Sequence, residues 1–156
     1  MNKAELAEKN FNEGCNCCQA VVLAYAEEMG LTEKEALRIG SLFGGGFGRL
    51  REVCGAVSGM TMVAGYMKGY DDLTDAQAKK DAYVLERTLV EEFTKKYKSA
   101  ICRDILGLAE KEKAGDPSER TAQYYAERPC GGCVRTAAEI LEKEIFGREP
   151  GKAEEK

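Results

Sequence analysis

The amino-acid sequence predicts an all-α protein, a single-domain helical bundle of about six helices with a glycine-rich loop. Three observations favour it: apolar residues recur at steps of three and four, caps and glycines divide the chain into helix-length segments, and no stretch alternates as a strand does. A chain of 156 residues suits one domain with a buried core. We expect that domain over residues 1–147 and a disordered C-terminal tail over 148–156.

Local signals place the helices along the chain. Asn16 is a natural N-cap for the second helix, and Gly30 is a C-terminal stop for it. Thr32 with Glu35 three residues later has the capping-box pattern at the start of the third. The polar stretch 110–128 predicts a connection that holds a helical turn or two. The predicted helices span residues 4–11, 17–29, 32–43, 52–68, 74–98, 101–108 and 133–146.

Two of these helices carry a clear apolar face, which predicts that one side of each packs against the core. On the longest helix the face consists of Ala78, Ala82, Leu85, Leu89, Phe93 and Tyr97. On the last helix it consists of Val134, Ala137, Leu141 and Ile145. An apolar helix face of this kind is also compatible with a homodimer.

The composition excludes several classes of protein. A net charge of -4 argues against a nucleic-acid-binding protein, which normally carries a basic face. The longest charge-free apolar stretch, 53–67, is shorter than the roughly 18 residues of a membrane span, so it predicts a buried core helix. The N-terminal segment lacks the apolar region of a secretory signal. We therefore expect a cytoplasmic protein without a membrane span.

Seven cysteines and no histidine limit the possible chemistry. In a reducing compartment, seven thiols favour metal binding or redox chemistry over static disulfides. The lack of histidine excludes c-type haem attachment, histidine-ligated zinc and Cys-His proteases. Any chemistry must therefore use thiolates, carboxylates and cations.

Four cysteines stand at the predicted starts of four different helices: Cys17, Cys54, Cys102 and Cys130. Exposed N–H groups and the helix dipole stabilise an anion there, which lowers the pKa of a thiol, and nearby arginines such as Arg51 and Arg103 lower it further. The pattern predicts a redox or metal site. Cys133 completes a CxxC with Cys130, which serves either as a metal knuckle or as a dithiol.

Structural interpretations apply to other residues. Cys15 and Cys18 are interpreted as packing residues, because free cysteine is commonly buried. Gly59 is interpreted as a site of close helix crossing, whereas Gly55 would clear room for something bound at Cys54. The glycine-rich stretch 44–50 completes no phosphate-binding motif, so we interpret it as a hinge beside Cys54.

The stretches "NCCQAV", "CGAVSG", "CRDILG" and "CGGCVRTAAEIL" resemble, in order and spacing, the family of suggested redox proteins named for its C-GCAxxG-C-C cysteine pattern. The resemblance runs from about residue 11 to 145. It implies that Cys17, Cys54 and Cys102 are the first three family cysteines and that Cys130, or alternatively Cys133, is the fourth. The cysteine and first glycine of "CGAVSG" stand in the reverse order to the family's name. A similar domain accompanies haem in split-Soret cytochromes, with an iron-sulfur cluster, and this chain has no haem motif.

Three hypotheses follow. The first is an iron-sulfur cluster held by Cys17, Cys54, Cys102 and Cys130 for electron transfer. The second is a thiol-disulfide protein without metal, in which Cys130–Cys133 or Cys54–Cys102 forms the pair. The third is a zinc- or copper-binding module, weakened because a zinc site usually draws on two CxxC pairs. The redox partner is unknown in each case.

Overall fold

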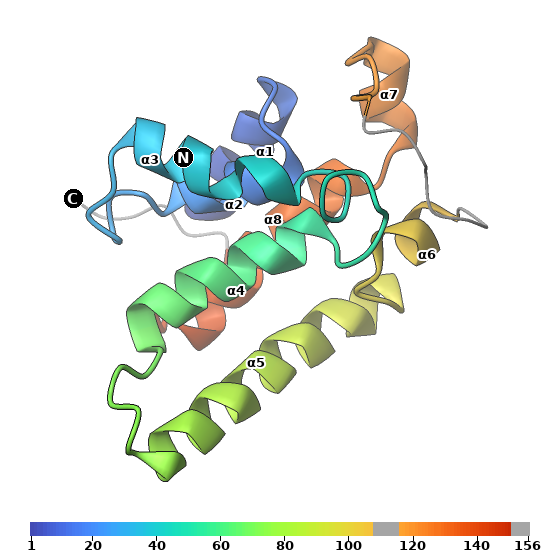
Figure 1. Ribbon diagram of the computed structural model, residues 1–156. Helices are drawn as coiled ribbons and strands as arrows, with labels where there is room; N and C mark the ends of the chain where they lie inside the picture. Colours follow the sequence, from blue (N-terminus) through green and yellow to red (C-terminus); the bar gives the residue numbers. More distant parts are fainter. Residues whose placement is uncertain (108–115, 151–156) are drawn as a thin grey trace.

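The computed structural model describes residues 1–107 and 116–150 (Figure 1). Those residues form eight α-helices and one 3₁₀ turn, and their only strand-like pairing is an isolated antiparallel bridge between Val53 and Ile101. The all-α prediction is therefore confirmed. The elements are α1 (Lys3–Asn12), α2 (Cys17–Ala24), α3 (Glu33–Gly40), η1 (Ser41–Phe43), α4 (Gly55–Lys68), α5 (Ala76–Tyr97), α6 (Cys102–Leu106), α7 (Ala122–Glu127) and α8 (Cys130–Glu144).

The expected caps are present at the starts of α2 and α3. The Asn16 side chain accepts a hydrogen bond from the Gln19 amide, and the Thr32 hydroxyl accepts one from the Glu35 amide. Each is a capping box, since the third helical side chain bonds back to the cap. The helix predicted over 17–29 ends at Ala24, because the chain continues from Tyr25 in tighter turns.

Two helices begin three residues away from the predicted start. α4 begins at Gly55, three residues late, because Val53 pairs with Ile101 and the backbone at Arg51 is left-handed (φ 58°). α8 begins at Cys130, three residues early, so the whole CxxC is helical. α7 supplies the helical turns predicted in the polar connection 110–128, of which residues 110–115 lie outside the described part. Of the predicted tail 148–156, residues 151–156 also lie outside it.

Helices α1, α2, α4 and α8 pack around the core, α3 covers α2, and α5 lies along α4 and α8 (Figure 1). Small residues let α2 and α4 approach closely: a Cβ atom on Gly59 would lie 2.9 Å from the Cβ of Val21. This confirms Gly59 as a packing residue. Leu89 and Phe93 of the predicted α5 face are fully buried, and the face of α8 is buried throughout. No helix of the described chain is both long and apolar enough to cross a bilayer.

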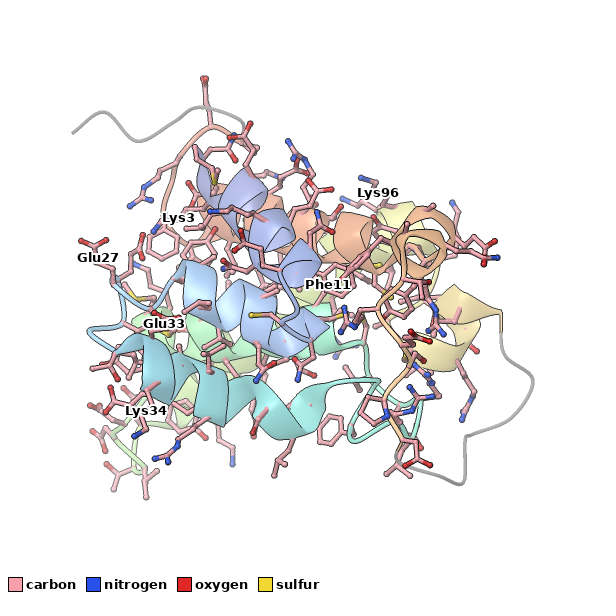
Figure 2. All side chains as sticks on the ribbon, turned by 90° about the horizontal axis from the view of Figure 1, so that it is seen from above. Lys3, Phe11, Glu27, Glu33, Lys34 and Lys96 are labelled. Atoms are coloured by element: carbon pink, nitrogen blue, oxygen red, sulfur yellow. The ribbon has the colours of Figure 1, made fainter. Side chains whose placement is uncertain are left out.

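Buried polar groups gather near the C-terminal end of α8, where it meets α1 and α2. The Tyr25 hydroxyl is hydrogen-bonded at 3.0 Å to the Glu142 carboxylate. Lys3 forms an ion pair of 2.7 Å with Glu28, and Arg148 lies 3.6 Å from Glu142. We call these five residues the ion-pair end of the bundle. Figure 2 shows Lys3 at this end of α1 and Phe11 at the other.

Candidate functional site: a pocket of cysteines at helix starts

Five cysteine side chains line one pocket at the opposite end of the bundle. The pocket encloses about 50 Å³, which is room for a few water molecules. The starts of α2, α4, α6 and α8 meet there, and in Figure 1 the glycine-rich loop, α6 and α7 lie on that side of the molecule. The cysteines that line the pocket are Cys17, Cys54, Cys102, Cys130 and Cys133.

The expected position of four of these cysteines at helix starts is confirmed. Cys17, Cys102 and Cys130 are the first residues of α2, α6 and α8, and Cys54 is the N-cap of α4. Cys133 lies one turn into α8 and is 1% exposed. Sequence stretches that are far apart therefore bring their sulfur atoms to a common pocket.

A short backbone ladder joins the segments that carry Cys54 and Cys102. The amide of Cys54 donates to the carbonyl of Ala100 at 2.8 Å, and the amide of Cys102 donates to the carbonyl of Glu52 at 2.6 Å. These bonds flank the bridge between Val53 and Ile101. They satisfy N–H groups that the starts of α4 and α6 would otherwise leave unpaired, and they hold the two cysteines beside each other.

Two glycines allow the elements to close around the pocket. A Cβ atom on Gly46 would lie 2.6 Å from the Cβ of Cys102, and the backbone of Gly46 is left-handed (φ 69°). Both the close contact and the backbone conformation therefore require glycine at this position. A Cβ on Gly55 would lie 3.0 Å from the Cβ of Cys17. In the structure, Cys17 occupies the space that Gly55 clears.

Cys17 and Cys130 form the first of two thiol pairs. The Cys17 thiol donates a hydrogen bond to the Cys130 sulfur, which lowers the pKa of Cys130 from 9.0 to about 7. The guanidinium groups of Arg128, Arg51 and Arg120 lower it further against the cost of burial. The same hydrogen bond, together with burial, raises the pKa of Cys17, which keeps its proton. One thiolate and one thiol therefore stand side by side near neutral pH.

Cys54 and Cys133 form the second pair. A hydrogen bond from the Cys133 thiol lowers the pKa of Cys54, and the amides of Val57 and Ala56 in the first turn of α4 lower it further, against burial. The hydrogen bond to Cys54 and burial raise the pKa of Cys133. The pairs thus join Cys17 with Cys130 and Cys54 with Cys133, which differs from both pairings considered from the sequence.

Cys102 is the fifth thiol, and its partner is an arginine. A guanidinium nitrogen of Arg51 lies 3.6 Å from the Cys102 sulfur, but burial outweighs this cation and raises the pKa of Cys102. The expectation that a helix start lowers the pKa of its thiol holds for Cys54 and Cys130 and is wrong for Cys17 and Cys102. Burial and a shared proton outweigh the helix dipole at those two positions.

Three arginines line the pocket, and only one of the two expected to support it is among them. Arg51 is 3% exposed and lines the pocket, whereas Arg103 does not. Arg120 and Arg128 take its place. Their guanidinium groups lie 4.8 and 5.0 Å from the ring centre of Tyr124, which also lines the pocket. No sequence signal marks Arg120, because it reaches the pocket only when the segment before α7 folds over Phe11.

Cys15 and Cys18 do not line the pocket. Cys18 is fully buried, its sulfur lies 3.8 Å from the sulfur of Met62, and burial raises its pKa to about 12. Cys15 is half-buried, and burial raises its pKa. Both therefore lie where packing residues were expected.

Within residues 1–107 and 116–150, no three His, Cys, Asp or Glu side chains are arranged to hold a metal ion. The donors in the pocket are instead two pairs of thiols and one thiol beside an arginine. This arrangement offers no observation that favours the zinc or copper alternative.

We compared the sequence with known proteins and protein families. No match was found among curated proteins or among solved structures. The sequence model of one family, described as "Putative redox-active protein (C_GCAxxG_C_C)", matches residues 15–144. The match covers all seven cysteines and every helix that lines the pocket. The chain therefore belongs to the C_GCAxxG_C_C family of redox-active proteins.

Proposed function

We propose that this protein is a thiol-disulfide redox protein in which Cys17 and Cys130 cycle between a dithiol and a disulfide. The observation that carries the proposal is that both cysteines, the first residues of α2 and α8, line the same pocket, where the protonation of one thiol depends on the other. In such a pair one sulfur has to be a thiolate to attack, and its neighbour has to hold a proton until it attacks in turn. The lowered pKa of Cys130 and the raised pKa of Cys17 fit these two roles.

The proposed cycle uses a substrate disulfide as the oxidant. The Cys130 thiolate attacks one sulfur of the substrate, the substrate S–S bond breaks, and the first substrate thiolate leaves with the proton of Cys17. The Cys17 thiolate then attacks the Cys130 sulfur, breaks the mixed disulfide and releases the second thiolate, which takes a proton from water. Two electrons pass from the protein to the substrate, and the protein is left with a Cys17–Cys130 disulfide.

Cys54 and Cys133 provide a second dithiol deeper in the bundle. Both are almost fully buried, at 6% and 1% exposed. A buried thiol is protected from direct attack, so we expect this pair to react more slowly with reagents in solution. Free thiols throughout the chain suit a reducing compartment, and we propose the cytoplasm as the site of the activity.

An iron-sulfur carrier is a second candidate, because the pocket brings together cysteines from different helices and cysteine thiolates are the usual ligands of such clusters. Cys17–Cys130 and Cys54–Cys133 would then each hold one iron of a two-iron cluster, in place of the set with Cys102 expected from the sequence. The cluster would supply one-electron transfer. Three arginines at the pocket would offset its negative charge.

One preparation tests both candidates. The full-length protein is isolated without oxygen, its iron, acid-labile sulfide and zinc are measured, and alkylated thiols are counted by intact mass before and after mild oxidation. The thiol-disulfide proposal expects no stoichiometric metal and a fall from seven titratable thiols to five, restored by a reductant. Iron and sulfide in equal, stoichiometric amounts would instead establish the cluster. Seven thiols that persist after oxidation would rule out the disulfide.

A further inference from the structure

A second cavity adjoins the cysteine pocket and is not used by the proposed disulfide exchange. It is larger, about 220 Å³, and it lies between the glycine-rich loop and the segment that leads into α7. Six residues line both cavities, so they share a wall. These residues are Asn16, Gly45, Arg51, Arg120, Tyr124 and Arg128. A molecule that occupies the larger cavity therefore borders directly on the cysteines.

The lining of the larger cavity is rich in arginine. Its lining includes four arginines, Arg49, Arg51, Arg120 and Arg128, and no carboxylate among the described residues. This concentration of positive charge occurs in a chain with a net charge of -4. Arginine side chains bind carboxylates through paired hydrogen bonds, so this concentration of arginines around one cavity favours an anionic ligand.

The arginines come from two segments that fold toward each other. Arg49 and Arg51 lie on the glycine-rich loop, where both have left-handed backbones, at φ 64° and 58°. Arg49 donates a hydrogen bond of 2.9 Å to the Ser118 hydroxyl across the cavity. Arg120 and Arg128 flank the ring of Tyr124 on the opposite side. The cavity is therefore built by specific contacts, and its cations are held in place.

We propose that this cavity binds the carboxylate end of a small anionic disulfide and presents the S–S bond to Cys130. The inference rests on the proposed function and adds the charge class of its substrate. A bidentate guanidinium is the side chain best suited to a carboxylate, and the wall shared by the two cavities allows the uncharged part of the ligand to reach the thiols. The reaction is the exchange already described: Cys130 bonds to one substrate sulfur, Cys17 displaces it, and two substrate thiols are released.

The test compares three small disulfides as oxidants of the reduced, full-length protein. They are 3,3′-dithiodipropionate, which is dianionic, 2-hydroxyethyl disulfide, which is neutral, and cystamine, which is dicationic. Each second-order rate is divided by the rate of the same disulfide with free 2-mercaptoethanol, a thiol without a charged substituent, which removes its intrinsic reactivity. We expect the dianion to react at least about fivefold faster than the neutral compound, the dication to react slowest, and added salt to reduce the differences.

A variant of the larger cavity separates this inference from the chemistry. Arg49 lines the larger cavity and is absent from the lining of the cysteine pocket. R49Q should slow the dianion severalfold and leave the neutral disulfide unchanged. R87Q, at an exposed arginine of α5, is the matched control and should change neither rate.

Binding of suberate, an unreactive dicarboxylate of the same length, supplies a readout that needs no redox step. Calorimetry should detect suberate on the wild type and on C130S, and weaker binding on R49Q. Equal normalised rates for the three disulfides, or no difference between wild type and R49Q toward suberate, would overturn the anion site and leave the disulfide exchange standing. If no disulfide oxidises the protein while suberate still binds, the exchange falls and the anion site remains.

Discussion

The two ends of α8 bury polar groups in opposite ways. Cys130 begins the helix and Glu142 lies twelve residues later, about 18 Å along its axis. At the ion-pair end, the contacts join unlike groups: a phenol with a carboxylate, and an ammonium with a carboxylate. At the pocket end, the two interacting groups are alike, since the thiols of Cys17 and Cys130 interact beside a cavity. The unlike partners satisfy each other's charges and hydrogen bonds and so stabilise the fold. Two thiols can in addition form a covalent bond with each other by losing two electrons.

The two ends also differ in the direction of their pKa shifts. Burial and the Glu142 carboxylate raise the pKa of Tyr25, so its proton stays in place as a hydrogen-bond donor. The Cys17 hydrogen bond and three arginines lower the pKa of Cys130 into the physiological range. Burial therefore keeps the Tyr25 hydroxyl protonated at one end of α8. At the other end, the Cys17 thiol and the arginines favour loss of the proton from Cys130. The following substitutions test this comparison, in order of decreasing expected effect.

The substitution C130S should have the largest effect on redox chemistry. It removes the attacking sulfur, so the Cys17–Cys130 disulfide cannot form and the rapid loss of two titratable thiols should disappear. Thiol counting by intact mass after a short exposure to oxidant measures this. C15S is the matched control, because Cys15 does not line the pocket, and it should keep the rapid loss. Rapid loss of two thiols in C130S would assign the chemistry to another pair.

Two Gly→Ala substitutions in one helix should have opposite effects on stability. In G55A the new methyl group would lie 3.0 Å from the Cβ of Cys17, and we expect a loss of about 1–3 kcal/mol in the free energy of unfolding. In G65A the methyl group meets nothing within 4 Å, so higher helix propensity should add about 0.5–1 kcal/mol. Urea unfolding measures both. Equal stability changes would mean that Gly55 is not a contact site for Cys17.

At the other end of α8, the substitution Y25F should reduce stability without altering the thiols. It removes the hydroxyl that bonds to the Ala138 carbonyl and to Glu142, which should cost about 1–2 kcal/mol. The alkylation rate of Cys130 should match that of the wild type, because the change lies about 18 Å along α8. A large change in thiol reactivity would show that the two ends are coupled.

The alkylation rate of Cys130 by iodoacetamide should rise with pH with a midpoint of about 7, because the thiolate is the reacting form and its pKa is lowered to that value. Below the midpoint the sulfur is protonated and the rate falls. R128Q removes one of the cations that stabilise the thiolate, so its midpoint should move upward. R87Q should leave the midpoint unchanged. A wild-type midpoint near 9 would show that the thiol is not activated.

Local signals in the sequence predict most of the fold and the positions of the cysteines on it. Caps such as Asn16 and Thr32 mark helix starts, and the apolar periodicity of α5 and α8 marks their buried faces. The start of α4 is not predicted, because it depends on a bridge between Val53 and Ile101, which are far apart in the sequence. Propensity carries no information on such a contact.

The partners of the cysteines are less predictable than their positions. The spacing of Cys130 and Cys133 fits either a metal knuckle or a local dithiol, but the fold gives each a partner from another helix. Arg103 is adjacent to a cysteine in sequence and does not line the pocket, whereas Arg120 is distant in sequence and does. Pairing and charge at the site depend on tertiary packing, which spacing along the chain does not reveal.

The central claim is that Cys17 and Cys130 form a bond with each other, and peptide mapping of the mildly oxidised protein tests it most directly. Trypsin leaves Cys17 within residues 10–34 and Cys130 within 121–135, so a disulfide between them joins these two peptides. We expect the joined peptides in the wild type, in C133S and in the double variant C15S/C18S, and their loss in C17S. Joined peptides that persist in C17S, or oxidised protein without them, would contradict the account.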